Sequence, residues 1–382
     1  MEFNPKYTIS TRLANQLLEI ERHKEAINVL PITPNLLVSL KETARLLSTH
    51  YSTQIEGNDL TQKEVQSIAR GKQGNFTGRE RDEREVRNYF RALAFVEEQL
   101  QDKAPITEIF IKTLHSLVLV GSKKPTPYRE GQNVIKDSSS GGIVYMPPEA
   151  KDVSTLMKEL VIWINQEVDT GELPAPLLAG LVHYQFATIH PYYDGNGRTA
   201  RLLTTYILHT TGYGMKGIYS LEEYYAKQLS DYYDALNIGT SHNYYGGRAQ
   251  ADITPFLEYF VGGMSISFGK VRKSAISLQT KHPQNIDASA KLRELRPQQR
   301  AVLLLFQNYK EVGMQEIAEH LGMDTRSAYT LVKKWIEQGF MQIINTSKRT
   351  RTYGLSLEWE SLLSQQQFSS SLKTIEERGK KK

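Results

Sequence analysis

The stretch HPYYDGNGRTAR, at positions 190–201 of the 382 residues, is the feature that most restricts how this chain can fold. Its Gly-Asn-Gly turn allows positive φ angles, so that consecutive N–H groups can point into one concavity. A helix is predicted over residues 198–209, where apolar side chains recur at helical spacing. A glycine turn that leads into a helix N-terminus is an anion site, because unpaired N–H groups and the positive end of the helix dipole face the same way.

Ionisable side chains surround this turn. Arg198 and Arg201 are three residues apart and therefore share a helix face. His190 can accept a proton near neutral pH, and the carboxylate of Asp194 can hold Mg²⁺. A turn of this kind often only joins two elements, and arginines at a helix start are often simply solvated. The coincidence of a base, an acid, a concave turn and two arginines instead predicts a polyphosphate site with a base beside it.

The same residues resemble the signature of Fic proteins, HPFx[DE]GNGRxxR, with Tyr192 in place of the usual phenylalanine. Most Fic proteins studied transfer AMP from ATP to a hydroxyl side chain of a protein. The resemblance implies that His190 is the general base and that Asp194 holds Mg²⁺ between the α- and β-phosphates. It also implies that the turn stabilises charge on the α-phosphate and that the two arginines bind the β/γ end. The ATP-binding residues implied in this stretch are Gly195, Asn196, Gly197, Arg198, Thr199, Ala200 and Arg201.

An acidic residue, Glu56, lies where a predicted helix ends, within STQIEGN at positions 52–58, with Gly57 as the expected residue just past that end. A negative charge at the negative end of a helix is unfavourable unless a cation faces it. A solvated surface glutamate is the ordinary alternative. The segment resembles the inhibitory motif [ST]xxxE[GN] of Fic proteins, in which the glutamate pairs with the second signature arginine. By that resemblance Glu56 pairs with Arg201 and blocks productive placement of the ATP γ-phosphate.

Two short β-prone runs, at residues 128–135 and 141–148, flank the sequence KDSSS and predict a hairpin. The hairpin precedes the signature as the flap of Fic proteins does, on which a target segment lies. An exposed edge strand can pair with an extended peptide and present its hydroxyl in register. A surface loop with no role is the alternative. The residues expected on this target-docking edge are Gly142, Ile143, Val144 and Tyr145.

One helix is predicted over residues 221–236. The resemblance places Tyr232 near the adenine, with Gln228 one turn earlier facing the same ATP pocket; core packing is the alternative for the tyrosine. His183 and His190 are seven residues apart, unlike the i,i+4 pair of a helical zinc site, so His183 is predicted to be structural. His115 is likewise predicted to be a core or helix-packing residue.

The chain contains no cysteine, so that disulfides and thiolate zinc sites are excluded. No apolar run approaches the length of a membrane span, and the first ten residues lack the apolar core of a signal peptide. We therefore expect a cytoplasmic protein without membrane contact. The net charge of +5 is concentrated in residues 291–356, which contain eleven Lys and Arg against six Asp and Glu. Any argument for nucleic-acid binding rests on this C-terminal third.

The C-terminal third is predicted to form a separate domain at residues 291–357, after a linker at 270–290 and before a disordered tail at 358–382. Three helices and a basic hairpin indicate a winged helix, whose third helix and wing would contact DNA phosphates. Winged helices also serve as protein-docking modules, and both alternatives stay open. The cationic candidates for DNA contact are Arg326, Lys333, Lys348, Arg349 and Arg351.

We thus predict a mainly α fold: an N-terminal helical region at 1–101, a Fic-type core with a β-hairpin flap at 102–269, and the winged helix. The implied reaction converts ATP and a protein Ser, Thr or Tyr hydroxyl into the O-AMP protein and pyrophosphate, with self-modification and a homodimer as further expectations. The alternatives are transfer of UMP, phosphate or phosphocholine, removal of AMP, and a DNA-binding regulator that only senses nucleotide. His190 beside two arginines argues against a pure sensor, which needs no base.

Overall fold

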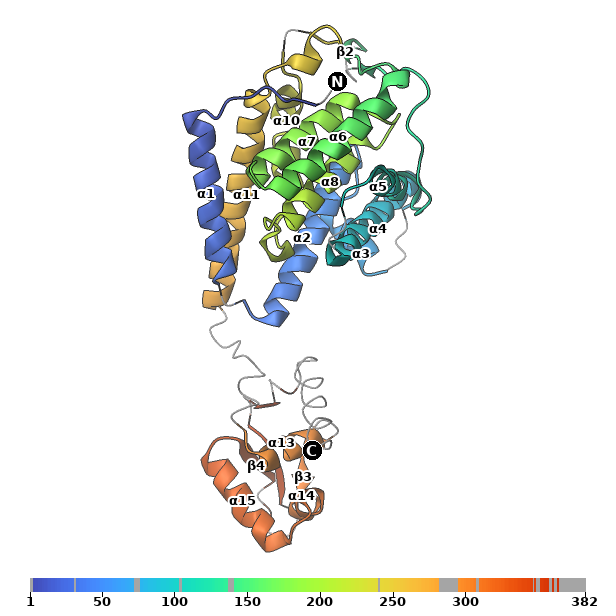
Figure 1. Ribbon diagram of the computed structural model, residues 1–382. Helices are drawn as coiled ribbons and strands as arrows, with labels where there is room; N and C mark the ends of the chain where they lie inside the picture. Colours follow the sequence, from blue (N-terminus) through green and yellow to red (C-terminus); the bar gives the residue numbers. More distant parts are fainter. Residues whose placement is uncertain are drawn as a thin grey trace. The chain divides into compact units, whose positions relative to one another are not determined.

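The computed structural model describes residues 3–30, 32–71, 76–102, 105–136, 141–239, 241–281, 295–306, 309–345, 347, 351–356, 359–360 and 363. The chain forms two compact units, Met1–Leu278 (unit 1) and Gln279–Lys382 (unit 2) (Figure 1). No helix within these described ranges is long and apolar enough to cross a membrane.

Unit 1 is a helical unit, which confirms the predicted fold class. Its helices are α1 (Thr11–Asn28), α2 (Pro34–Gln54), α3 (Gln62–Ala69), α4 (Glu80–Asp102), α5 (Glu108–Val120), α6 (Ala150–Thr170), α7 (Ala175–Ile189), α8 (Asn196–Thr210), α9 (Glu222–Lys227), α10 (Leu229–Leu236) and α11 (Thr254–Lys281). Two 3₁₀ turns, Met215–Gly217 and Arg248–Gln250, lie between them.

The centre of unit 1 is α7, whose side chains are buried on almost every face. A helix that is apolar all round must be covered by other elements, and α8 covers one side of it. Gly180 allows α11 to approach another side, because a Cβ at this position would lie 2.9 Å from Leu257 Cδ2. In Figure 1, α1 and α11 run side by side at the edge of the unit, and His23 of α1 lies beside Arg272 of α11. Other helices therefore enclose the central pair α7 and α8, and the turn between these two helices carries the signature.

The predicted hairpin is present. Strand β1 (Ile135–Lys136) pairs antiparallel with β2 (Ile143–Tyr145), with Ile135 opposite Tyr145. Residues 137–140, which we expected in the connecting turn, lie outside the described residues.

The single helix predicted over residues 221–236 is wrong. The structure has two helices, α9 and α10, which are separated at Gln228 by non-helical angles of φ −128° and ψ 51°. The break allows Tyr225 and Tyr232 to stack with ring centroids 4.9 Å apart. In a continuous helix, seven residues span about 10 Å, so these two rings could not stack face to face.

The linker predicted at residues 270–290 begins too early. Helix α11 continues to Lys281, and Ala275 is completely buried on its inner face, where Val271 also packs against the core. Only four of the twelve residues at 270–281 are apolar, and the charged and polar residues among them hid the helix in the sequence. Residues 282–290 lie outside the described residues.

In the part of unit 2 that the structure describes, three helices accompany a three-stranded antiparallel sheet in the order β3-β5-β4. Its elements are α13 (Pro297–Leu305), β3 (Val312–Gly313), α14 (Met314–Leu321), α15 (Thr325–Glu337), β4 (Met341–Asn345) and β5 (Thr352–Leu355). Gly322 ends α14 with φ 64°, and Asp324 caps α15 by accepting hydrogen bonds from the N–H groups of Arg326 and Ser327. The winged-helix assignment stays a prediction, and the predicted tail lies almost entirely outside the described residues.

Candidate active site

The turn between α7 and α8 has a fixed shape. His190 ends α7 in a left-handed conformation (φ 51°), and Gly195 opens α8 with φ 79°. The side chain of Asn196 closes the turn: its Oδ1 accepts from Tyr192 N at 3.0 Å, and its Nδ2 donates to Tyr192 O at 2.8 Å. Asn196 is therefore engaged with the turn itself and fixes the orientation of the first N–H groups of α8.

His115 supports this turn from α5. Its ring stacks on Tyr192 with centroids 3.5 Å apart, and its Nε2 lies 2.8 Å from Asp194 O. The prediction of a packing histidine is confirmed, since His115 is 1% exposed. Its contact with the turn was not predicted, because no sequence pattern links two segments that are almost eighty residues apart.

His190 has the tautomer that a base requires. Nδ1 lies 3.3 Å from Ala187 O, and a carbonyl can only accept, so Nδ1 carries the proton and Nε2 has the free lone pair. Burial lowers the pKa of His190 to about 4, which the hydrogen bond to Ala187 and the charge of Glu56 partly oppose, while Arg129 lowers it further. The imidazole is therefore neutral at pH 7 and able to accept a proton.

His190 lines a cavity of about 690 Å³ between the signature turn, the flap and α10. This volume lies in the range of sites for small ligands and cofactors. Its lining combines apolar and aromatic side chains with polar and charged ones: Glu56, Ile135, Lys136, Val144, Tyr145, Ala187, Thr188, His190, Asn196, Gly197, Arg201, Tyr232, Tyr233, Asp234, Leu236, Asn237 and Arg248.

The structure contains the expected ion pair between Glu56 and Arg201. Arg201 Nη2 donates to Glu56 Oε1 at 2.8 Å and to Ser52 O at 2.8 Å, and its Nε donates to Ser52 Oγ at 2.8 Å. Burial would lower the pKa of Arg201, but the charge of Glu56 raises it well above its usual value. Gly197 makes room for this pair, because a Cβ there would collide with Glu56 Oε1.

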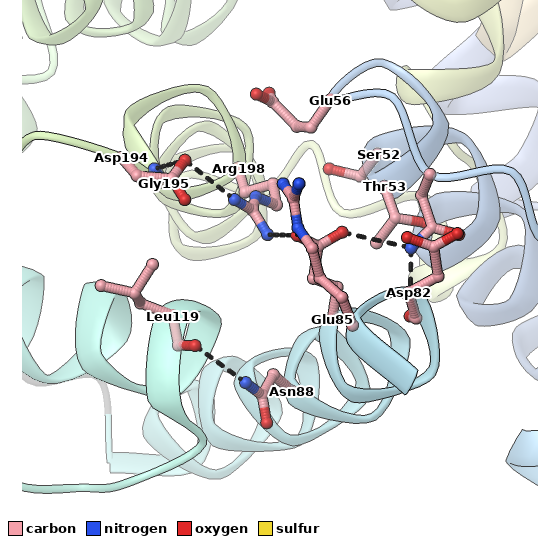
Figure 2. A network of polar contacts seen from close by, with 12 residues as sticks. Ser52, Thr53, Glu56, Asp82, Glu85, Asn88, Leu119, Asp194, Gly195 and Arg198 are labelled. Carbon is pink, nitrogen blue, oxygen red and sulfur yellow. Dashed lines mark hydrogen bonds and ion pairs between the residues drawn. The ribbon is translucent and has the colours of Figure 1, made fainter. Parts of the chain in front are cut away.

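Arg198 faces away from the cavity. Its guanidinium is 2% exposed and lies between Asp194, at 3.1 Å, and Glu85 of α4, at 3.7 Å, as Figure 2 shows. The expected role of Arg198 at the β/γ-phosphates is therefore not supported by its position. The i,i+3 spacing put both arginines on one face of α8, but Glu85 attracts Arg198 toward α4, while Arg201 extends toward α2.

Asp194 is the candidate ligand for Mg²⁺. Its side chain is 56% exposed, and one oxygen, Oδ1, accepts from Gly195 N and from Arg198. The described residues contain no cluster of three His, Cys, Asp or Glu. Mg²⁺ usually takes only one or two protein carboxylates, together with waters and substrate phosphates. A single exposed carboxylate beside an anion site fits that requirement.

Of the other residues predicted to contact ATP, some line the cavity and some do not. Tyr232 lines the cavity, but it is 3% exposed and its hydroxyl bonds to His183 Nε2 at 2.9 Å. Gln228 is exposed at the break between α9 and α10 and is not in the cavity lining, because the predicted one-turn spacing assumed a continuous helix. Thr199 and Ala200 are buried inside the fold and do not line the cavity either.

The prediction that His183 is structural is confirmed. Both ring nitrogens have partners, Thr204 Oγ1 at 3.0 Å and the Tyr232 hydroxyl. Burial lowers the pKa of His183 to about 3, so that it stays neutral.

The predicted docking edge of the flap is only partly available. Val144 O accepts from His242 Nδ1 at 2.8 Å, and Met146 exchanges backbone hydrogen bonds with His242 and Tyr244. Tyr145 is 5% exposed and donates to Thr188 O. The expectation of a free edge is therefore wrong at Val144 and Tyr145, since a segment one hundred residues away covers it. Ile143 and Gly142 are exposed.

Arg129 is a site residue that the sequence analysis missed. It is 4% exposed, and its guanidinium donates to three carbonyl oxygens, those of His190, Gly131 and Pro148. Its own N–H donates to Pro191 O at 2.9 Å. One side chain thus connects the base-bearing turn with both ends of the flap segment. An arginine among polar residues gives no periodic signal, so only the fold shows this role.

The predicted DNA contacts belong to unit 2. Arg326 and Lys333 are exposed on α15, whereas Arg351 is half-buried. Lys348 and Arg349 lie outside the described residues.

Comparison with known proteins finds similarity to Fic proteins. Residues 105–208 match the model of the Fic/DOC family. A protein adenylyltransferase Fic of Drosophila virilis is 28% identical over 254 residues, which are 66% of this chain and 47% of that protein. A homologue from Drosophila willistoni is also 28% identical, over 66% of this chain and 46% of its own. The match thus spans about half the length of these curated relatives.

Solved structures agree with the fold. A Fic family protein from Desulfovibrio desulfuricans is similar over 93% of this chain and 99% of its own, with a TM-score of 0.60 and 24% identity. A Fic domain containing signaling protein from Bacteroides thetaiotaomicron covers 69% of this chain and 98% of its own, with a TM-score of 0.58 and 28% identity.

Proposed function

We propose that the protein is a protein adenylyltransferase, because residues 105–208 match the model of the Fic/DOC family. The proposed reaction transfers AMP from ATP to the hydroxyl of a protein side chain and releases pyrophosphate. The relatives in Drosophila carry the name of this activity. The observation that carries the proposal is the neutral His190, with Nε2 free, in the same cavity as Arg201 and the N-terminus of α8.

The chemistry assigned to the chain is a proton transfer and charge stabilisation. His190 Nε2 takes the proton from the attacking hydroxyl as its oxygen bonds to the α-phosphorus. The bond from that phosphorus to the oxygen bridging to the β-phosphate breaks, and pyrophosphate leaves. The first N–H groups of α8 point at the charge that develops on the α-phosphate oxygens. Of the two signature arginines, Arg201 lines the cavity and is assigned to the β/γ end, since Arg198 is paired with Glu85 and Asp194.

Asp194 would hold Mg²⁺, which supplies positive charge to the phosphates when it is bound. Tyr233 and Asn237 also line the cavity and are suited to the nucleoside. We assign Glu56 as an autoinhibitory residue, because the guanidinium of Arg201 cannot serve it and a phosphate in the same geometry.

The experiment is a transfer assay with ATP labelled either at the α- or at the γ-phosphate, on the full chain carrying Glu56→Gly. Label that enters protein from the α-position alone, together with pyrophosphate release, supports AMP transfer. Label from the γ-position would indicate phosphate transfer, and no label with His190 intact would contradict both. Glu56→Gly combined with His190→Ala is the matched negative control.

A further inference from the structure

The helix that carries the inhibitory segment is held at a second place, one turn before Ser52. Ser48 Oγ donates a hydrogen bond of 2.8 Å to Glu222 Oε2, and both residues are buried. Ser48 precedes Ser52 by four residues, so both lie on one face of α2. The core therefore holds α2 at two successive turns, through Glu222 at Ser48 and through Arg201 at Ser52.

Glu222 is a buried carboxylate, 3% exposed, and no Lys or Arg forms an ion pair with it among the residues described. It accepts hydroxyl hydrogen bonds instead: from Ser48, from Ser220 Oγ at 2.8 Å and from Tyr89 at 3.4 Å. A buried charge is costly unless its hydrogen bonds are made. The carboxylate of Glu222 therefore keeps the hydrogen bond from Ser48 only while α2 packs against the core. Ser48 loses this hydrogen bond when α2 moves away.

Tyr89 of α4 connects the two anchors. It is fully buried, and burial followed by the charge of Glu222 raises the pKa of its hydroxyl well above its usual value, while Arg201 acts in the opposite direction. The hydroxyl therefore stays protonated and donates to Glu222, close to the cation that binds Glu56. Tyr89 therefore lies between the hydrogen bond of Ser48 with Glu222 and the ion pair of Arg201 with Glu56.

We propose that Glu222 is a positioning residue for autoinhibition, which holds α2 at the rotation and depth where Glu56 meets Arg201. The proposal rests on the proposed function, because it concerns regulation of the same site. Glu56 follows the last turn of α2, and its N–H donates to Thr53 O at 3.0 Å, so that a shift of α2 carries Glu56 with it. A hydrogen bond that forms only while α2 packs against the core favours the state in which Glu56 is paired with Arg201 over the state in which it is not.

The test uses two serines that donate equally to the same carboxylate oxygen. Ser48→Ala removes the donor on α2, and Ser220→Ala removes a donor that lies outside α2. A hydrogen bond to a charged group shifts an equilibrium by about 10- to 100-fold. We expect Ser48→Ala to raise AMP incorporation by about tenfold or more over wild type, and Ser220→Ala to leave it within about twofold. In the Glu56→Gly background neither change should increase incorporation further, because the lock is already absent.

Equal activation by both serine variants, no activation by Ser48→Ala, or activation that persists beside Glu56→Gly would overturn the proposal. A merely destabilising effect would lower incorporation in both backgrounds. Hydrogen exchange of the peptide covering residues 48–58 gives a second readout that needs no catalysis: Ser48→Ala should speed its exchange and Ser220→Ala should not. If Glu56→Gly itself transfers no AMP, the proposed function fails, and the exchange data alone then decide whether Glu222 holds α2.

Discussion

Arg201 and Glu56 form an asymmetric ion pair: the arginine side chain is 1% exposed, whereas that of Glu56, whose Oε1 lies 2.8 Å from Arg201 Nη2, is 24% exposed. Arg201 is also tied to Ser52 by two further hydrogen bonds. Because the cation is enclosed and the carboxylate reaches solvent, Glu56 is the partner that can leave. Release of the site therefore requires Glu56 to leave Arg201 and needs no rearrangement of α8.

Glu56→Gly is expected to raise AMP incorporation by roughly 10- to 100-fold, which corresponds to losing one hydrogen bond between charged groups. Incorporation includes label on the protein's own side chains. Arg201→Ala should not have this effect, because it removes the phosphate ligand together with the lock. Labelled-AMP incorporation by wild type, both single variants and the double variant checks this. A double variant as active as Glu56→Gly would show that Arg201 does not serve ATP.

His190→Ala is expected to lower AMP transfer by about 10²–10⁴-fold, the usual contribution of a general base. ATP affinity should change little, since the imidazole is a proton acceptor and not a phosphate ligand in the proposed role. Transfer is measured in the Glu56→Gly background, and ATP binding by calorimetry on the same protein. Transfer at an unchanged rate would remove His190 from the mechanism.

The local parts of the site were predictable from the sequence, and its long-range supports were not. The glycine turn, the helix after it and the segment of Glu56 each depend on neighbouring residues, so their patterns are visible in the chain. The cover on the flap by His242, the pairing of Arg198 with Glu85 and the stacking of His115 on Tyr192 depend on segments far apart. The spacing of apolar residues along the chain does not indicate such contacts. The break at Gln228 was missed because residues 221–236 contain no glycine or proline that would mark it.

The free energy of unfolding is expected to fall as the pH drops from about 6.5 to 4, the range between the usual histidine pKa and the shifted ones. Burial lowers the pKa of His183 to about 3, and those of His115, His190 and His209 to about 4. Within that range the unfolded chain binds protons that the folded chain does not, so acid favours unfolding. Denaturant titrations across the range measure the slope. His209 lies outside the site, and His209→Gln should reduce the slope of the free energy of unfolding against pH by an amount that corresponds to at most one bound proton. An unchanged slope would contradict the lowered pKa of His209.

Arg129→Lys is expected to reduce AMP transfer by about tenfold while ATP affinity changes by less than about twofold. A lysine cannot reproduce the fork of donors that reaches the carbonyls of His190, Gly131 and Pro148, and an unsatisfied buried polar group costs about 1–3 kcal/mol. The base-bearing turn and the flap should then lose their common support, which affects the acceptor hydroxyl more than the nucleotide. Transfer and ATP binding are compared in the Glu56→Gly background, together with the melting temperature. Equal losses of ATP affinity and transfer would show that Arg129 supports the whole cavity and does not specifically align the flap with His190.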